Sequence, residues 1–415
     1  MPRRLPLPLA LLLLALCPAM AAAHAYPLAP APGNPVMSAT DPGAGLAVDD
    51  RGRVAVTVPL GTGTAVAVRA PGGAWTVAPL PGIDTPGDLL FTAGGGAVVG
   101  YGTADTHEYA GATYDEPRGG SPCCQRPFVF RWRPGAPPRR QAMVPLDSTD
   151  REVEAFAVDH DGTAYAILEQ EDSEDVSPDI TLAAVRVPAR GAPARRALPT
   201  DGSIIGYSVS LRASERGAGA TVAWNDDTAM RRLTATPGGW RAIGHPAPAP
   251  QNSVQTVYLD PRLRPIHVVE HARHLTLRVA AGRQQRLGTL GPHAGWQAAM
   301  GADGTLAILW TTQGSVLHER VVDRAGRLGP TRDLGTIAPP PHATYDVAID
   351  ARGGVHVAWA QPGGTVVVQA PGSRRVLSRD GAPLELYDLA VSPNGATAAV
   401  VTAGPQRLVA VTTRP

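Results

Sequence analysis

Lysine is absent from this sequence. All 37 basic residues are arginine, and 36 acidic residues leave a net charge of +1. Without lysine the chain cannot form a Schiff base with a cofactor or hold a nucleotide through a phosphate-loop lysine. Pyridoxal enzymes, P-loop NTPases and kinases are therefore excluded, and we expect no cofactor. A net charge near zero also gives no excess of positive charge for binding nucleic acid, so we expect no nucleic-acid partner.

Long hydrophobic runs are also scarce. The longest covers residues 5–17, which is shorter than the roughly 20 residues that cross a bilayer. Two arginines precede this run and a mostly alanine segment at residues 21–25 follows it, a pattern typical of a secretory signal peptide. We predict a signal peptide at residues 1–25 and one soluble domain at residues 26–415. The protein is then secreted, to the medium or the cell envelope, and has no membrane span.

Cysteine is rare, and the two cysteines beyond the signal segment are neighbours, Cys123 and Cys124. In an oxidising compartment they can pair only with each other or with another chain. Adjacent Cα atoms lie about 3.8 Å apart, less than the roughly 4.4–6.8 Å of ordinary disulfides. A bond between them would be a strained ring, and free thiols are the alternative. Neither the spacing nor a third close ligand predicts a metal site here.

A strand–turn–strand pattern repeats along the chain and gives the clearest structural signal. Each copy has an Asp or Asn and a Gly between two alternating apolar runs, which is typical of a β-hairpin. The clear copies lie at residues 46–56, 156–166, 347–357 and 389–399, and weaker copies begin at Leu89, Val209, Val257 and Ala298.

The spacing of the copies sets the size of the repeating unit. We define the anchor as the residue three positions before the turn glycine. The anchors are Asp49, Thr92, Asp159, Arg212, Asp260, Gly301, Asp350 and Ser392, and the mean interval between them is 49 residues. Six units carry the glycine itself, at Gly52, Gly95, Gly162, Gly304, Gly353 and Gly395. Such a turn needs positive φ at its glycine, which we predict for Gly353.

Each unit continues with two further strands, and the third often ends in a Pro-Gly turn, as at residues 371–372. Four antiparallel strands in about 45 residues form the unit of a β-propeller blade. Stacking the blades in a ring buries both faces of each sheet. We predict an all-β fold, a single propeller of eight blades. Seven blades are the alternative, because the unit at Val257 is degenerate.

The last unit shows only three strands, so its outer strand must come from elsewhere. Residues 35–40 near the N-terminus could supply that strand and close the ring. The repeats resemble the degenerate repeats of secreted bacterial propellers. The signature boxes of sialidases, of WD-repeat proteins and of quinoprotein dehydrogenases are absent. The resemblance therefore implies a fold and no particular activity.

Propeller geometry indicates where a ligand would bind. The loops that lead into the inner strands share one face with the loops between second and third strands, and propellers usually bind ligands there. Two loops of the second kind are long and belong to neighbouring blades, at residues 102–127 and 169–179. Long loops on a rigid scaffold commonly carry function. The alternative is that these loops are exposed to solvent and have no function. The run of acidic residues in the second loop favours this alternative there.

Aromatic and polar residues before the inner strands are the candidate binding groups. The segments His293-Ala-Gly-Trp296 and His342-Ala-Thr-Tyr345 match one another in adjacent blades. Flat rings beside imidazoles suit a sugar. The candidate ligand-binding residues are Trp296, Tyr345, Tyr387, Tyr207 and Asn252. Packing between blades is the alternative role for the aromatic ones. Three tryptophans at the end of second strands are expected in the core: Trp224, Trp310 and Trp359.

One apparent zinc motif is discounted. His267-Val-Val-Glu270-His271 matches an inverted zinc-protease pattern, whose chemistry needs both histidines on one face of a helix. The flanking residues instead predict a strand, which would point Glu270 away from both histidines. We therefore expect no metal site in this segment.

Three functions stay open. The first is a binding protein for an extracellular carbohydrate or a partner protein. The second is a glycan-active enzyme: a hydrolase would need two carboxylates roughly 5–10 Å apart, and a lyase would need an arginine and a base. The candidate catalytic residues are His107, Tyr109, Arg118, Arg151, His293 and His342. The third is a structural envelope protein. We expect a monomer, and the sequence does not decide whether it is an enzyme.

Overall fold

The computed structural model describes most of the repeating region. The described residues are 25–27, 45–60, 63–83, 85–105, 125–144, 152–171, 180–198, 208–214, 218–225, 229–236, 239–244, 247–248, 254–262, 264–279, 282–291, 295–313, 315–338, 345–377, 385–403 and 408–413. They include no helix long and apolar enough to cross a membrane.

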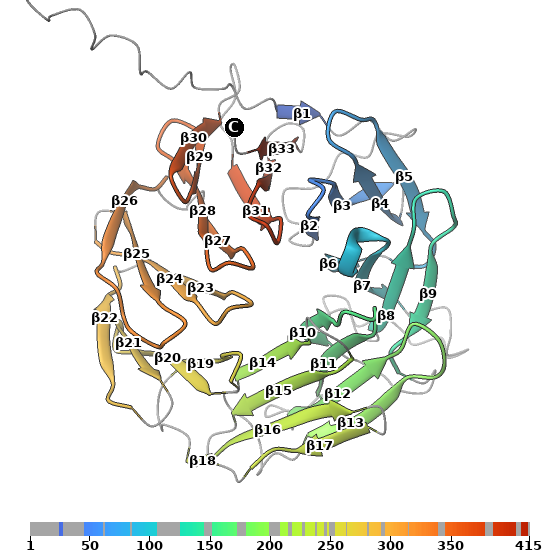
Figure 1. Cartoon of the computed structure of the whole chain (residues 1–415), viewed down its shortest axis with the longest axis horizontal. Helices are drawn as coiled ribbons and strands as arrows, with labels where there is room; N and C mark the ends of the chain where they lie inside the picture. Colours follow the sequence, from blue (N-terminus) through green and yellow to red (C-terminus); the bar gives the residue numbers. More distant parts are fainter. Residues whose placement is uncertain are drawn as a thin grey trace, which may run out of the picture.

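The described strands form eight antiparallel sheets arranged as blades around a central axis (Figure 1). Seven sheets have four strands, and the sheet of blade 4 has a fifth, short strand. In seven blades the four main strands are neighbours in chain order, from an inner strand at the axis to an outer strand at the rim, and in blade 8 the outer strand comes from the start of the chain (Figure 1). The predicted all-β fold, a single propeller of four-stranded antiparallel blades, is confirmed.

The first four blades follow the chain from blue to green in Figure 1. Blade 1 has β2 (Leu46–Val48), β3 (Val54–Leu60), β4 (Gly63–Arg69) and β5 (Trp75–Leu80). Blade 2 has β6 (Thr85–Phe91), β7 (Val98–Asp105), β8 (Gln125–Trp132) and β9 (Arg139–Ala142), with the short 3-10 helix η1 (Ala93–Gly95) in its first turn. Blade 3 has β10 (Glu152–Val158), β11 (Ala164–Glu171), β12 (Ile180–Val187) and β13 (Ala194–Leu198). Blade 4 has β14 (Ser208–Ala213), β15 (Ala220–Asn225), β16 (Ala229–Thr236), β17 (Gly239–Ala242) and the extra β18 (Ala247–Pro248).

The remaining blades complete the ring. Blade 5 has β19 (Val254–Leu259), β20 (Pro265–His271), β21 (His274–Val279) and β22 (Gln285–Thr289). Blade 6 has β23 (Trp296–Met300), β24 (Leu306–Thr311), β25 (Val316–Val322) and β26 (Arg332–Thr336). Blade 7 has β27 (Tyr345–Ile349), β28 (Val355–Gln361), β29 (Thr365–Ala370) and β30 (Ser373–Leu377). Blade 8 has β31 (Glu385–Val391), β32 (Thr397–Ala403) and β33 (Leu408–Thr413), to which β1 (Ala25–Pro27) adds the outer strand.

The hydrophobic core lies between the blades. Strands alternate, so each blade presents one set of apolar side chains to the preceding blade and the other set to the following one. Val129 of blade 2 packs with Leu168 of blade 3, for example, whereas Tyr165 on the other face packs with blade 4. The three expected core tryptophans Trp224, Trp310 and Trp359 are at most 2% exposed. Their assignment to the core is confirmed.

The turns between first and second strands are built around the anchors. Asp350 shows the pattern: its Oδ1 accepts hydrogen bonds from the backbone N–H of Arg352 and Gly354, at 2.9 and 2.8 Å. The backbone N–H of Gly353 donates to the carbonyl of Asp350 at 3.0 Å. All six predicted turn glycines have positive φ, which is +82° at Gly353. The predicted hairpins and their glycine requirement are therefore confirmed.

Each such turn also contacts its neighbour around the ring. A Cβ at Gly353 would lie 2.4 Å from Oδ2 of Asp303, and one at Gly395 would lie within contact of Asp350. The backbone N–H of Gly219 donates to Asp159 Oδ2 at 2.9 Å, from blade 4 to blade 3. The glycines therefore serve two purposes, because they allow positive φ and they let adjacent turns touch.

The closing strand is not the one expected. Residues 35–40, which lie outside the described residues, were expected to supply the outer strand of blade 8. Instead β1 holds that position, with Ala25 opposite Ala410 and Pro27 opposite Leu408. The principle of closure by an N-terminal strand is right, but the segment is wrong. The closing strand lies ten residues earlier, directly at the predicted end of the signal peptide.

Substitution of Gly353 by alanine tests the contact between turns. Gly363 also has positive φ, +92°, but a Cβ there meets no atom within 4 Å. We expect Gly363→Ala to lower the free energy of unfolding by about 1 kcal/mol through backbone strain alone. Gly353→Ala should cost about 2–3 kcal/mol more, because Asp303 must move. Urea unfolding of both variants measures the difference. Equal losses in the free energy of unfolding would show that contact between adjacent turns does not add to the cost.

Two N-terminal truncations test the role of β1. A chain that begins at His24 retains β1, and a chain that begins at Leu28 lacks it. The second should melt several degrees lower, because β33 then becomes an unpaired edge and the ring is no longer closed by hydrogen bonds between its ends. Melting curves measure this, and identical melting temperatures would mean that β1 contributes nothing to closure.

Candidate functional site

The inner strands of three blades bring carboxylates together at the channel. Asp346 lies on β27 of blade 7, Asp388 on β31 of blade 8 and Asp88 on β6 of blade 2. All three occupy the same position, four residues before the anchor of their unit. Asp88 raises the pKa of Asp388 through its charge, although blade 1 lies between their blades along the ring. The three carboxylates therefore lie at the same level of the inner strands, and the charge of Asp88 reaches Asp388 across blade 1.

Asp346 and Asp388 form a carboxyl pair that joins blades 7 and 8. Asp346 accepts backbone hydrogen bonds at both oxygens, from Val347 N–H at 2.7 Å and from Leu389 N–H of the next blade at 2.8 Å. The Asp346 and Asp388 side chains also interact with each other, and each affects the pKa of the other. Burial raises the pKa of Asp346 to about 6. Burial, followed by the charge of Asp346, raises the pKa of Asp388 well above its ordinary value.

Asp88 and Tyr101 extend the cluster into blade 2. Burial raises the pKa of Asp88, and burial together with the charges of Asp88 and Glu154 raises the pKa of Tyr101. Tyr101 therefore keeps its phenolic proton and can act only as a neutral hydrogen-bonding group near the acids. Its ring centroid lies 5.1 Å from that of Phe156 in blade 3. We call Asp88, Tyr101, Glu154, Asp346 and Asp388 the channel cluster.

Two glycines make room for this arrangement. A Cβ at Gly87 would lie 2.0 Å from the Tyr101 ring, and a Cβ at Gly45 would lie 2.3 Å from the carbonyl oxygen of Gly87. The N–H of Gly45 donates to Thr57 Oγ1 at 2.8 Å, which fixes the start of β2. Blade 1 thus places a bare backbone where blades 2, 7 and 8 place carboxylates. The absence of a side chain at Gly45 leaves this side of the channel to Asp88 and Asp388.

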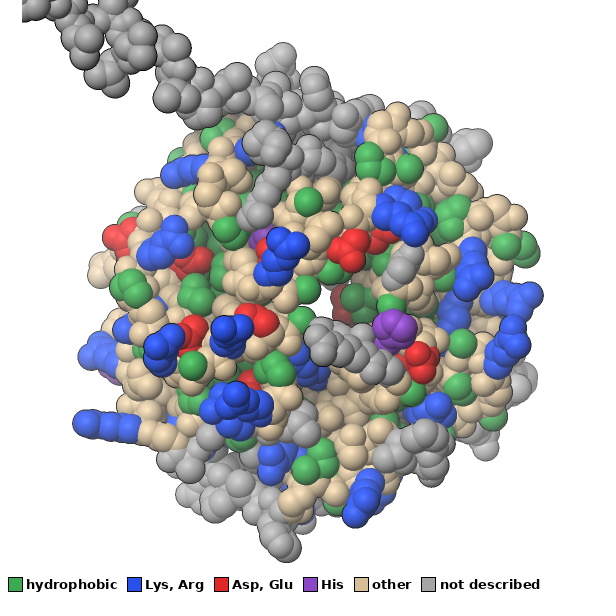
Figure 2. Space-filling view, viewed as in Figure 1, with side chains coloured by type: hydrophobic (Ala, Val, Ile, Leu, Met, Phe, Trp, Pro, Cys, Tyr) green, Lys and Arg blue, Asp and Glu red, His purple; other side chains and the backbone are tan. Residues whose placement is uncertain are grey.

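A pocket of about 330 Å³ lies next to the cluster, between blades 8, 1 and 2. Its walls are mostly apolar, and its polar groups come from the turns of the three blades. The residues that shape it include Leu46, Val48, Leu89, Phe91, Ala390 and Pro393. Leu89 and Ala390 follow Asp88 and Asp388 closely on the same inner strands. The space-filling view shows a hollow near the centre of the disc with acidic side chains at and within it (Figure 2).

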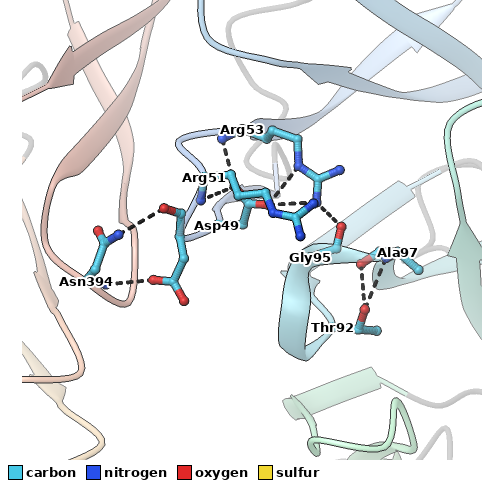
Figure 3. A network of polar contacts seen from close by, with 8 residues as sticks. Asp49, Arg51, Arg53, Thr92, Gly95, Ala97 and Asn394 are labelled. Atoms are coloured by element: carbon cyan, nitrogen blue, oxygen red, sulfur yellow. Dashed lines mark hydrogen bonds and ion pairs between the residues drawn. The ribbon is translucent and has the colours of Figure 1, made fainter.

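The rim of this pocket is a network of turn residues (Figure 3). Asp49 holds Arg53 through its Oδ2, with 2.8 Å to Nε and 2.7 Å to Nη2, and Arg53 also donates to the carbonyl of Gly95 in blade 2. On the other side Asn394 of blade 8 donates to Asp50 twice, from its backbone N–H to Oδ1 and from Nδ2 to the carbonyl, both at 2.9 Å. The network ties blades 8, 1 and 2 together, so the pocket has a fixed rim.

Most of the predicted site residues lie outside the described part of the chain. These are His107, Tyr109, Arg118, Cys123, Cys124, Arg151, Tyr207, Asn252, His293 and His342. The suggested disulfide between the two cysteines and the proposed catalytic and binding roles of the others stay predictions.

The three aromatic candidates that the structure describes are held by the protein itself. Trp296 Nε1 donates to Glu270 Oε2 at 3.1 Å, and Tyr345 donates its hydroxyl to the carbonyl of Gly295 at 2.6 Å. Trp296, Tyr345 and Tyr387 all pack against hydrophobic clusters between blades. These contacts match the packing role, and the ligand-binding role stays a prediction.

The discounted zinc motif lies on strand β20, as expected. His267 is 2% exposed, and burial together with the charge of Arg278 lowers its pKa to about 4. Glu270 is engaged by Trp296 of blade 6. Within the described ranges no group of three or more His, Cys, Asp or Glu side chains is placed to hold a metal ion.

Comparison with known proteins supports the propeller fold and identifies no specific function. No protein-family model matches the sequence, and no curated protein matches it. Among solved structures, the Dos1 propeller aligns with a TM-score of 0.50 at 10% identity, over 91% of this chain and 93% of that one. Virginiamycin B lyase from Staphylococcus aureus, determined with quinupristin, aligns with a TM-score of 0.41 at 11% identity, over 92% and 98%. Oligogalacturonate lyase from Vibrio parahaemolyticus aligns with a TM-score of 0.45 at 8% identity, over 89% of each chain.

The raised pKa values of Asp346 and Asp388 give the channel cluster a pH dependence. A carboxyl whose pKa is raised in the folded state binds protons that the unfolded chain releases, so its contribution to stability falls as pH rises from about 4 through 6 and above. Asp388→Asn keeps a donor to Asp346 and removes the second charge. We expect this variant to be about 1–3 kcal/mol more stable than the parent at pH 8 and little changed at pH 4.

Melting curves of the two proteins between pH 4 and pH 8 measure this effect. Asp161→Asn, which neutralises an exposed turn aspartate of blade 3, is the matched control and should follow the parent. If Asp388→Asn loses stability with pH as steeply as the parent, the raised pKa of Asp388 does not cause this pH dependence.

Proposed function

We propose that this chain is a secreted binding propeller, which holds an extracellular glycan or partner protein at its central channel. The observation that carries the proposal is the carboxyl pair Asp346–Asp388 beside Asp88, next to a pocket with apolar walls. Carboxylates that cost free energy to bury, and that no described basic side chain neutralises through a salt bridge, are frequent at functional sites.

The pair can both donate and accept hydrogen bonds. When one of the two groups is protonated, Asp346 and Asp388 together offer a hydroxyl donor and carboxylate acceptors. Asp88 adds a second acceptor and Tyr101 a neutral hydroxyl group. Sugar hydroxyls are themselves donors and acceptors, and apolar walls suit the C–H face of a sugar ring. This combination favours a polyhydroxylated ligand.

The geometry favours binding over hydrolysis. A glycoside hydrolase places its two carboxyl groups roughly 5–9.5 Å apart, on either side of the scissile bond. Both oxygens of Asp346 are engaged by backbone N–H groups, which leaves it poorly placed to take a proton from water. A structural envelope protein, the third possibility, would not need carboxyl groups of raised pKa at its axis.

Secretion is part of the proposal and rests on the segment at residues 1–25. The position of β1 supports it, because cleavage after Ala23 would leave the closing strand at the start of the mature chain. No linker would then separate the signal peptide from the closing strand of the propeller.

A glycan array on the mature protein tests the proposal, with Asp88→Asn and Asp388→Asn as the site variants. We expect one ligand class to bind the parent and to bind each variant about tenfold more weakly, because each change removes a charged hydrogen-bond partner. Asp161→Asn should bind like the parent. The same glycans, incubated with the parent and analysed for cleavage products, test the enzyme alternative. Cleavage that Asp388→Asn abolishes would replace binding by catalysis, and unchanged binding by both site variants would move the site away from the channel.

A further inference from the structure

The outer wall of blades 2 and 3 carries one sign of charge. The third and fourth strands of blade 2, with their turn, span residues 125–142 and contain five arginines and no acidic residue. The corresponding residues 180–198 of blade 3 contain four arginines and again no acidic residue. The space-filling view shows basic side chains along the rim of the disc (Figure 2). The net charge of +1 for the whole chain conceals this local excess.

Three of these arginines lie on the sides of blades 2 and 3 that face each other, and we use the word groove for this strip of the rim. Arg131 lies on the face of β8 that Val129 presents to blade 3, and Arg139 of β9 is its cross-strand partner. Arg195 of β13 is paired with Val185, which packs toward blade 2. Cross-strand partners share a face, so Arg139 looks toward blade 3 and Arg195 looks toward blade 2. The guanidinium groups therefore overlook one groove from both sides.

Arg131 is fixed in place by neutral acceptors. Its Nη2 donates to the carbonyl of Val187 at 2.8 Å, and weaker contacts of 3.4 Å reach the carbonyl of Gly162 and Oε1 of Gln141. No described carboxylate faces this half-buried cation, and desolvation lowers its pKa accordingly. A guanidinium held by carbonyls alone keeps its positive charge uncompensated, which favours an anion nearby.

Arg139 and Arg195 are exposed and make no ion pair with a described residue. By contrast Arg140 and Arg196, on the opposite faces of the same strands, bind the carbonyls of Gly82 and Trp240 in neighbouring blades. The strands thus use one arginine of each pair to join blades and leave the other free at the groove.

We propose that this groove binds a linear polysaccharide that carries carboxylate groups. Arg131 forms the fixed end of the site, and Arg139 and Arg195 reach the polymer from the two walls. Guanidinium forks match carboxylates in a bidentate geometry. A protein partner fits less well, because protein interfaces centre on apolar anchors. Of the exposed large apolar residues in the described ranges, Val77 and Val376 lie on blades 1 and 7, and Leu90 lies on the inner strand of blade 2, away from the rim.

The groove is separate from the channel cluster and does not depend on the proposed function. Its site is at the rim, on the third and fourth strands of blades 2 and 3, whereas the channel cluster lies on first and second strands at the axis. Asp388→Asn should leave binding at the groove unchanged.

Calorimetric titration with a short oligomannuronate tests the proposal, with the carboxyl-reduced, neutral form of the same oligosaccharide as the ligand control. We expect the charged form to bind, the affinity to fall with added salt, and the double variant R139S/R195S to bind about five- to tenfold more weakly. The matched control R324S/R352S removes two exposed arginines from blades 6 and 7 and should bind like the parent.

Hydrogen exchange on the parent gives a second measurement that needs no variant. Bound oligomannuronate should slow exchange at β9, β13 and the turn at residues 188–193. Equal binding by R139S/R195S and the parent, equal loss in the control, or protection elsewhere would each overturn the proposal. Binding of duplex DNA as tightly as oligomannuronate would overturn it too, because the groove would then respond to phosphate chains in general.

Discussion

The anchor carboxylates in the first turn of the blades are the interaction on which the rest of the structure depends. Asp49, Asp159, Asp260 and Asp350 are only 2–4% exposed. In each, Oδ1 accepts two backbone N–H groups of its own turn, two and four residues on, which satisfies a charge that would otherwise be costly to bury. Where the anchor is Thr92 or Ser392, a hydroxyl oxygen accepts the N–H five residues on instead.

The partner of the second carboxylate oxygen, Oδ2, differs from one anchor to the next. Asp49 and Asp260 bind an arginine four residues on, Asp159 binds the Tyr165 hydroxyl and a backbone N–H of blade 4, and Asp350 faces His356 at 3.3 Å. Local turn and contact between blades therefore use the same carboxylate. Because the turns are fixed to one another, the inner strands enter the channel in register, and residues four positions before the anchor meet at the axis. The channel cluster is a consequence of the anchors.

The sequence allowed the architecture to be predicted because the repeat is local chemistry. An Asp, a Gly three residues later and two alternating runs define a hairpin wherever they occur, and the eight anchors mark the blades. The closing strand could not be found in this way, since β1 has only three residues and no alternation to reveal it. Its partner is also 380 residues away in the chain, and pairing at that distance leaves no local pattern.

The channel cluster was within reach of the sequence but was missed. Columns eight and five residues before the anchors drew attention through their histidines and aromatic rings. The column four residues before the anchors holds Asp88, Asp346 and Asp388, and it carried the signal. Aspartate is uncommon within strands, so three aspartates at one position of the inner strands required an explanation. What the sequence could not show is that blades 2, 7 and 8 lie around Gly45, because that follows only from closure of the ring.

Closure also explains how a chain of almost no net charge separates its charges. Channel positions are few and lie close together, so the charges of Asp346 and Asp88 raise the pKa of Asp388. Rim positions are many and far apart, so arginines there remain fully charged and well solvated. Arginine suits the rim better than lysine would, because one planar group can hold a carbonyl of the next blade, as Arg140 and Arg196 do, while it remains exposed to solvent. The lack of lysine is then consistent with a ring in which the same residue type both joins blades at the rim and provides its positive charge.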